Sequence, residues 1–357
     1  MRIFNIDIQI HYSWWIIFTL LAWSLASTYF PHYYPNYTSQ WYWGSAIISA
    51  LLLFFSVLLH ELSHSLVAKA KNIKVESITL FFFGGVAGIT DEEMKPSSEF
   101  QMAIAGPLFS LVLGGIFYLI NQANGNGMVD AITFYLYQLN FILAIFNLVP
   151  AFPLDGGRAF RAILYAKYKD LQKATRIAAN GGRIFAAILI GLGLFSILTG
   201  QGGGLWFVLI GGFLYFIAGM SFNQVVIREI LNKISVRELL TKPVIIDPKM
   251  SFNNFQNKYR NKGIMNFVIQ NKRYSGILNL HKIKFSKNIS KKIKLKEISL
   301  PVSQIKTISE KDNAYKAYKL MTQQRLSLLP VLKKGKIIAI LRQTNLNTRL
   351  DWELRFK

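Results

Sequence analysis

The chain has 357 residues, of which 52% are hydrophobic, and it contains no cysteine. The lack of cysteine excludes disulfides, thiolate zinc ligands and a cysteine nucleophile, so any metal must be bound by His, Asp or Glu. The net charge of +23 belongs mostly to the C-terminal part: residues 228–357 carry 29 Lys+Arg against 8 Asp+Glu (+21), and residues 1–227 carry 12 against 10 (+2).

Residues 1–227 hold six apolar runs long enough to cross a bilayer, whereas the rest of the chain reads as a soluble sequence. We therefore predict a polytopic α-helical membrane domain over 1–227 and a cytosolic domain over 228–357. The first run is interpreted as a retained signal anchor. The predicted spans are residues 12–30, 44–70, 98–121, 129–150, 184–200 and 204–224.

Basic residues are distributed unevenly between the connecting segments. The segments 31–43, 122–128 and 200–204 contain no Lys or Arg, whereas the predicted 158–183 loop contains seven. Because basic loops stay in the cytosol, both termini and the 158–183 loop are predicted to be cytosolic. A basic soluble domain held at a membrane is expected to contact anionic lipid headgroups. No nucleic-acid recognition signature accompanies the charge, so nucleic acid is not expected as a partner.

The second span contains the sequence His60-Glu61-Leu62-Ser63-His64. Positions i and i+4 of a helix share a face, so both imidazoles can bind one ion, and Glu61 can take a proton from the attacking water. Burying such polar side chains in a membrane span costs free energy unless they face each other, water or an ion. The pattern predicts a catalytic zinc site, which requires a third protein ligand.

The segment Val75–Thr90 is apolar, rich in β-forming residues and interrupted by glycines. It is too short and too rich in glycine for a spanning helix. We predict a reentrant hairpin or loop that dips into the membrane from the cytosolic side, next to the second span.

The third metal ligand is predicted to be Asp155, which follows the fourth span. Two prolines and two glycines between residues 150 and 157 are expected to break the helix and to leave Asp155 on irregular backbone near membrane depth. A buried carboxylate there needs a partner, and a dication is a strong one. The alternative interpretation is a helix-capping Asp155 that pairs with Arg158.

The soluble part contains two similar stretches, residues 266–283 and 329–346. Each consists of a β-rich run, a short Lys-containing turn, a second β-run and the start of a helix. The segments 235–248 and 296–312 precede them at corresponding positions, which gives a period of about 60 residues. We therefore predict a pair of α/β repeats.

Four motifs resemble the site-2 protease family of intramembrane zinc metalloproteases (M50-type): HELSH at 60–64, FFFGG at 81–85, AGP at 105–107 and NLVPAFPLDGGR at 147–158. The paired repeats resemble cystathionine-β-synthase (CBS) domains, which some members of that family carry. The resemblance spans nearly the whole chain. It implies a polytopic helical membrane domain with a reentrant β-like segment, followed by a CBS-like pair.

The resemblance also implies the roles of the catalytic residues. His60, His64 and Asp155 would bind one Zn²⁺ per chain, and Glu61 would activate the water. Asn147 matches the Asn of the family's NxxPxxPxDG motif and would stabilise the oxyanion.

Gly84 and Gly85 match the glycines of the family's reentrant segment, which would bind substrate backbone as an added strand. The CBS resemblance implies a nucleotide site or a dimer contact. Where the Asp that typically contacts ribose is expected, this chain has Asn345. That difference argues against nucleotide binding and favours homodimerisation or membrane contact.

Together these patterns predict a zinc-dependent intramembrane endopeptidase that cuts transmembrane protein substrates near the cytosolic face, as in regulated intramembrane proteolysis. One alternative is a catalytically silent receptor or scaffold, which would not require the Glu61 that is present here. The other alternative is an ion transporter, for which the repeated halves of transporter folds are missing from the sequence.

Overall fold

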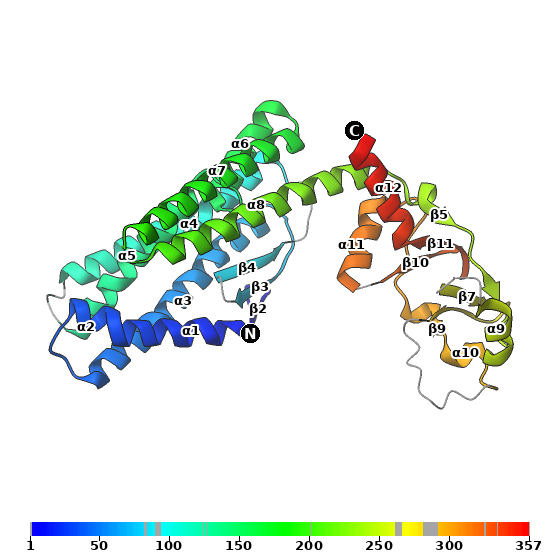
Figure 1. Ribbon diagram of the computed structural model, residues 1–357, viewed down its shortest axis with the longest axis horizontal. Coiled ribbons are helices and arrows are strands. Elements are labelled where there is room, and N and C mark those ends of the chain that lie inside the picture. The colour runs from blue at the N-terminus through cyan, green and yellow to red at the C-terminus, as the bar shows by residue number, and fades with distance from the viewer. Residues whose placement is uncertain are drawn as a thin grey trace. The chain divides into compact units, whose positions relative to one another are not determined.

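The computed structural model describes residues 2–356 apart from 82–83, 90–93, 124, 126, 201, 261–265, 281–291, 325 and 334. The chain divides into two compact units, Met1–Asn223 and Gln224–Lys357 (Figure 1). The division falls inside the helix α8 (Gly204–Asn232), so the two units share this helix.

The described residues of the first unit contain six helices that are long and apolar enough to cross a membrane, and they occupy the six predicted positions. The first is a continuous segment, Ser13–Tyr33, in which a π-helical turn η1 (Leu25–Tyr29) joins α1 (Ser13–Ser24) to α2 (Phe30–Tyr33). The others are α3 (Ser39–Ala70), α4 (Pro96–Ala123), α5 (Met128–Leu148), α7 (Leu171–Leu198) and α8.

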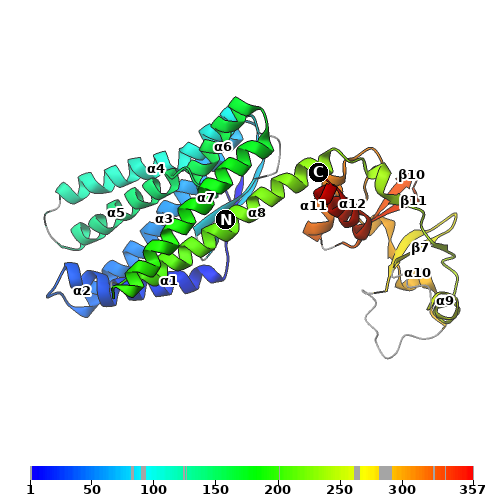
Figure 2. The ribbon, with the colours of Figure 1, turned by 45° about the horizontal axis from the view of Figure 1, so that its top comes forward.

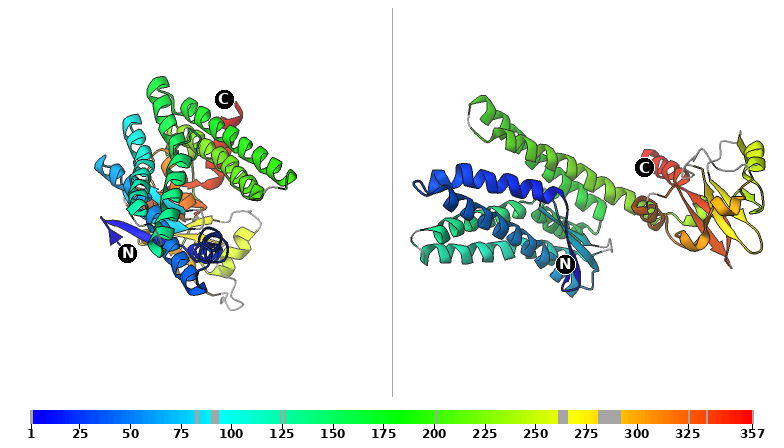
Figure 3. Two further views of the ribbon diagram at one scale, coloured as in Figure 1. Left: turned by 90° about the vertical axis from the view of Figure 1, so that its left-hand side faces the viewer. Right: turned by 90° about the horizontal axis from the view of Figure 1, so that it is seen from below.

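A small sheet lies at one end of these helices (Figure 3). Its strand order is β1-β2-β3-β4, with β2 and β3 parallel and β3 and β4 antiparallel. Ile6 and Ile78 of the sheet pack with Leu62 of α3 and Met102 of α4, which fixes the sheet against both helices. The strands are β1 (Arg2–Ile3), β2 (Ile6–Ile10), β3 (Val75–Phe81) and β4 (Gly84–Ile89).

The hairpin predicted within Val75–Thr90 is therefore present as β3 and β4. Gly84 has a φ of +124°, a conformation that a side chain would disfavour. Along the order of the described strands, β4 is an edge strand. Its free edge is available for a further strand.

The 158–183 segment was predicted as a loop, and this prediction is wrong. It forms α6 (Asp155–Tyr168) and the first turns of α7, as Figure 2 shows. Lys169 ends α6 in the left-handed conformation, and the Asp170 side chain accepts a hydrogen bond from the Lys173 backbone N–H to begin α7. The segment is rich in Ala, Arg and Lys, which are good helix formers. A search for apolar runs does not detect such a helix, because many of its residues are charged.

Asp155 was predicted on irregular backbone, but it is the first residue of α6. The irregular part is the turn 149–154 before it. Gly156 and Gly157 do not break the helix: a Cβ at Gly156 would lie 2.3 Å from the carbonyl oxygen of Leu148, and one at Gly157 would lie 2.3 Å from the Phe152 nitrogen. These glycines let the first turn of α6 pack directly on the backbone that precedes it.

The second unit is built from two small sheets, with orders β10-β11-β5 and β6-β7-β8-β9. They pack through Val268 and Ile277 of one repeat against Leu328, Ile337 and Ile340 of the other. The predicted paired β-runs are present, but the helix start predicted at the end of 266–283 lies outside the described residues. The elements are η2 (Val236–Leu239), β5 (Leu240–Thr241), β6 (Ile245–Ile246), α9 (Phe252–Tyr259), β7 (Asn266–Gln270), β8 (Ser275–Asn279), α10 (Leu295–Ile298), β9 (Leu300–Pro301), η4 (Val302–Gln304), α11 (Ala314–Gln324), β10 (Leu328–Lys333), β11 (Lys336–Arg342) and α12 (Gln343–Phe356).

Candidate metal centre

His60 and His64 lie one turn apart on α3, and each is only 3% exposed. Their Nε2 atoms are 3.2 Å apart. The predicted sharing of one helix face is therefore confirmed, and both rings point into the interior of the first unit.

Asp155 reaches the same point from α6. Its Oδ2 lies 3.2 Å from His60 Nε2 and 3.1 Å from His64 Nε2. Four ligand atoms placed tetrahedrally around zinc at bond lengths of about 2.0–2.1 Å are about 3.3 Å from one another. The three donor atoms therefore have both the chemistry and the spacing of a zinc site with one open position.

The alternative interpretation of Asp155 fits the geometry less well. Leu154, and not Asp155, is the residue that precedes the first helical position of α6. Arg158 Nη1 lies 3.9 Å from Asp155 Oδ1, a longer approach than either imidazole makes to Oδ2. The carboxylate thus lies closer to the two imidazoles than to the guanidinium of Arg158.

Two groups on α4 fix the imidazole rings. His60 Nδ1 lies 2.8 Å from Ser110 Oγ, and His64 Nδ1 donates to the backbone carbonyl of Met102 over 2.6 Å. With both Nδ1 atoms engaged, both Nε2 atoms are turned toward Asp155, an arrangement that also raises the basicity of metal-binding imidazoles. Sequence reasoning missed these partners, because HExxH implies that such partners exist but does not say which helix supplies them.

Glu61 lies beside the edge strand β4. A Cβ placed on Gly85 would be 2.4 Å from Glu61 Cγ, so the glycine lets the strand pass directly against the glutamate. The structure therefore brings Gly85 to the predicted base. Gly84, the first residue of β4, precedes it.

Asn147 lies half-buried in the last turn of α5. Within the described part of the chain, its side chain has no hydrogen-bond partner. The structure brings His60, His64, Asp155, Glu61 and Gly85 together, and it leaves the predicted role of Asn147 as a prediction.

Comparison with known proteins identifies the family. A model of peptidase family M50 matches residues 48–134 and 120–192, and a model of the CBS domain matches residues 295–350, the second of the two repeats. The solved site-2 protease from Methanocaldococcus jannaschii is 35% identical in sequence; the match covers 62% of this chain and 92% of that chain, with a TM-score of 0.44.

Two curated relatives carry related names. A Mycobacterium tuberculosis protein provisionally named zinc metalloprotease Rip3 is 37% identical over 215 residues, which are 59% of this chain and 54% of that protein. The Methanocaldococcus jannaschii protein named zinc metalloprotease MJ0392 is 45% identical over 150 residues, 41% of this chain and 43% of that protein. The chain thus spans about half the length of the curated relatives it matches.

The apolar helices, the buried His60 and His64 and the partly buried Asp155 define an integral membrane protein with a metallopeptidase-type site. The chain belongs to peptidase family M50, the site-2 protease family, and it contains a CBS domain. This confirms the resemblance found in the sequence motifs. The names of its relatives imply Zn²⁺ as the cofactor, in agreement with the donor set.

Proposed function

We propose that the chain is an intramembrane zinc endopeptidase that hydrolyses peptide bonds in the transmembrane segments of protein substrates. The observation that carries this proposal is the convergence of His60 and His64 with Asp155 at separations of 3.1–3.2 Å. Both histidines lie in a helix apolar enough to span a membrane. The adjacent Glu61 supplies a general base, which hydrolysis requires and ion transport does not. The proposal is therefore hydrolysis rather than ion passage.

Zinc, when bound by His60, His64 and Asp155, polarises the scissile carbonyl and lowers the pKa of water. The Glu61 carboxylate accepts the proton of the attacking water and then delivers it to the nitrogen of the leaving peptide. We propose that the Asn147 side-chain amide, which has no hydrogen-bond partner among the described residues, donates to the oxyanion that develops on the carbonyl oxygen.

The edge strand β4 holds the substrate. A helical peptide hides its carbonyl groups in hydrogen bonds, so the substrate must unwind before the attack. Pairing of the unwound segment with β4 replaces the lost hydrogen bonds and brings the scissile bond past Gly85, next to Glu61. We propose that the β3–β4 hairpin dips into the membrane to do so.

The positive-inside pattern supports a topology with both termini and α6 in the cytosol. In that orientation cleavage occurs near the cytosolic face. We propose that the membrane domain ends at residue 227 and that a separate basic domain begins at residue 228. This second domain contacts anionic lipid headgroups. Release of cytosolic segments from membrane-bound precursors, as in regulated intramembrane proteolysis, is the proposed consequence.

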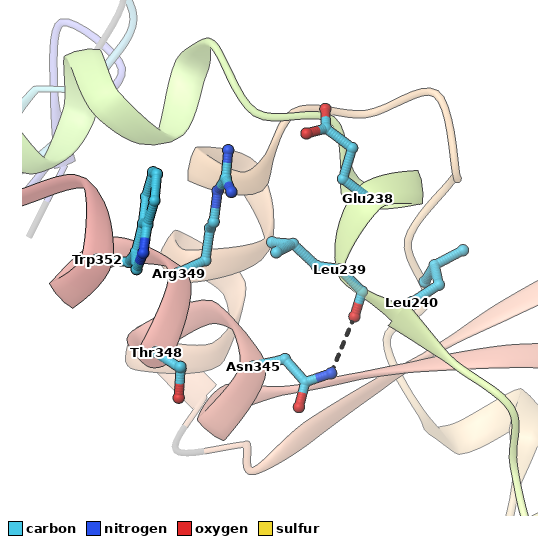
Figure 4. A pocket seen from close by; sticks show the side chains of 7 residues that line it. All are labelled: Glu238, Leu239, Leu240, Asn345, Thr348, Arg349 and Trp352. Carbon is cyan, nitrogen blue, oxygen red and sulfur yellow. Dashed lines mark hydrogen bonds between the residues drawn. The ribbon is translucent and has the colours of Figure 1, made fainter. Parts of the chain in front are cut away.

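The second unit contains a cavity of about 440 Å³ beside Asn345 (Figure 4). Asn345 Nδ2 donates to the Leu239 carbonyl oxygen over 3.1 Å, which ties this amide to the backbone of its own unit. The bond occupies the side chain that stands where a ribose contact is expected, which supports a CBS-like pair without a nucleotide. We propose that the pair serves homodimerisation or membrane contact. The residues that line the cavity are Glu238, Leu239, Leu240, Asn345, Thr348, Arg349 and Trp352.

The proposal is tested by comparing membranes of the native host that contain wild-type protein with membranes that contain Glu61→Gln. The amide keeps the shape of the side chain and the three metal-binding residues but cannot accept the proton. Quantitative peptide mapping should find membrane-protein fragments, cut within apolar segments, that occur only with wild type. Glu76→Gln, the same change on the exposed face of β3, serves as the control and should leave the fragments in place.

If wild type and Glu61→Gln yield the same fragments, although zinc is bound and both proteins are folded, the protease proposal fails. The silent receptor or scaffold then becomes the better description.

A further inference from the structure

A buried ion pair joins α4 to α6 close to the metal centre. Glu99, in the first turn of α4, is 3% exposed, and its Oε1 accepts hydrogen bonds from Nε of Arg161 over 2.9 Å and from Nη2 of the same residue. The Arg161 side chain is 15% exposed. Charge-assisted bonds of this kind are strong where water is excluded.

Arg161 makes a second contact, with the turn that leads to Asp155. Its guanidinium carbon lies 4.9 Å from the centre of the Phe152 ring, an ordinary cation–π distance. The Phe152 backbone N–H in turn donates to the Ala178 carbonyl of α7 over 3.3 Å. Arg161, which lies on the helix that carries Asp155, thus contacts both α4 and the turn before Asp155.

The same stretch of α4 also orients the histidines. Met102, whose carbonyl accepts the hydrogen bond of His64, follows Glu99 by one helical turn, and Gly106 follows by another. Gly106 faces the Nε2 atoms of His60 and His64. The first turns of α4 are therefore a common frame: they hold His64 through the Met102 carbonyl, and they hold α6 through Glu99.

We propose that Arg161 is a positioning residue, which with Glu99 fixes Asp155 at the distance needed to complete the zinc site. The proposal rests on the proposed zinc site. Two of the three ligands share a single helix, α3, and the third comes from α6. The distances between the three ligand atoms therefore depend on the contact between α6 and the frame. A metal site tolerates an error of only about 0.2 Å in ligand distance.

The test measures zinc affinity of the purified full chain by competition with a chelator, without reference to cleavage. Arg161→Gln should weaken zinc binding about 10–100-fold, the range typical of residues that support metal ligands. Arg2→Gln removes an exposed ion pair of the same unit, with Asp7 at 3.4 Å, and should leave the affinity unchanged. The thermal midpoint in EDTA reports separately on the stability of the metal-free fold.

A double-mutant cycle with Asp155→Asn separates positioning from a general loss of stability. If Arg161 acts through Asp155, the variant with both changes binds zinc no more weakly than Asp155→Asn alone. If the two losses multiply, or if Arg161→Gln binds zinc like wild type, the positioning role is wrong. Should Arg161→Gln not fold, Arg161→Lys, which keeps the charge but loses the two-pronged geometry, is placed in the same cycle and judged by the same criterion. A wild-type chain that binds no zinc would instead overturn the proposed function.

Discussion

The space in front of the two imidazoles depends on a single residue of α4. A Cβ placed on Gly106 would lie 2.2 Å from His64 Nε2 and 2.6 Å from His60 Nε2. The site can thus admit an ion only because this position has no side chain. The glycine of the AGP motif at 105–107 therefore has a steric role, namely to leave space for the ion. The sequence motif alone does not reveal this role.

We expect Gly106→Ala to abolish zinc binding while the helix itself persists, because alanine is a better helix former than glycine. The matched control is Gly115→Ala on the same helix, where an added Cβ meets nothing within 4 Å. That control should retain zinc and change the unfolding free energy by no more than about 1 kcal/mol. Zinc content per folded chain is the measurement, and full occupancy in Gly106→Ala would contradict this account of the site.

At the scale of single residues, most of the candidate site could be predicted from the sequence. His60, Glu61 and His64 are recognisable because their spacing is local, and Asp155 because a lone carboxylate beside a span needs a partner. Ser110 and Glu99 could not be predicted in this way. Their roles depend on how α4 packs against α3 and α6, and no local pattern encodes that packing.

At the scale of elements, the position of Asp155 depends on α7. The Phe152 backbone N–H bonds to the Ala178 carbonyl, and a Cβ on Gly182 would lie 1.9 Å from the Phe152 carbonyl oxygen. The turn 149–154 is therefore packed directly on the backbone of α7. Sequence reasoning placed a loop at 158–183 and missed this support, because hydropathy detects only the apolar part of the helix.

We expect Gly182→Ala to push α7 away from the turn, since the contact is with backbone that cannot rotate aside. The cost of such overpacking is typically about 1–3 kcal/mol, and zinc affinity should fall with it. Gly191→Ala on the same helix provides the control, because its Cβ would meet nothing within 4 Å. Thermal unfolding with and without zinc measures both effects. Equal behaviour of the two variants would show that the turn does not depend on α7.

At the scale of the whole molecule, an even number of spans should leave both ends of the chain on one side of the membrane. The charge pattern predicts that this side is the cytosol. The architecture of the CBS-like pair could be foreseen from its repeated β-runs. The continuity of α8 through both units could not be foreseen, because the apolar run that predicted the last span ends near residue 224 and the helix continues to Asn232.

The absence of cysteine permits a direct test of this topology without a prior substitution. We expect Lys167→Cys, at the exposed end of α6, to react with a membrane-impermeant thiol reagent only when the cytosolic face is open. Gln122→Cys, exposed at the end of α4, should react from the opposite face. Labelling of both from the same side would refute the predicted orientation.

The most direct test of the central claim is zinc X-ray absorption spectroscopy on the purified chain, wild type against Asp155→Ala. We expect nitrogen and oxygen ligands at about 2.0–2.1 Å in wild type, with the outer scattering of two imidazole rings. Asp155→Ala should bind zinc more weakly and lose one light-atom ligand, while the signal of two imidazoles remains. An unchanged spectrum and affinity in Asp155→Ala, or a wild-type spectrum without two imidazoles, would contradict a site formed by His60, His64 and Asp155.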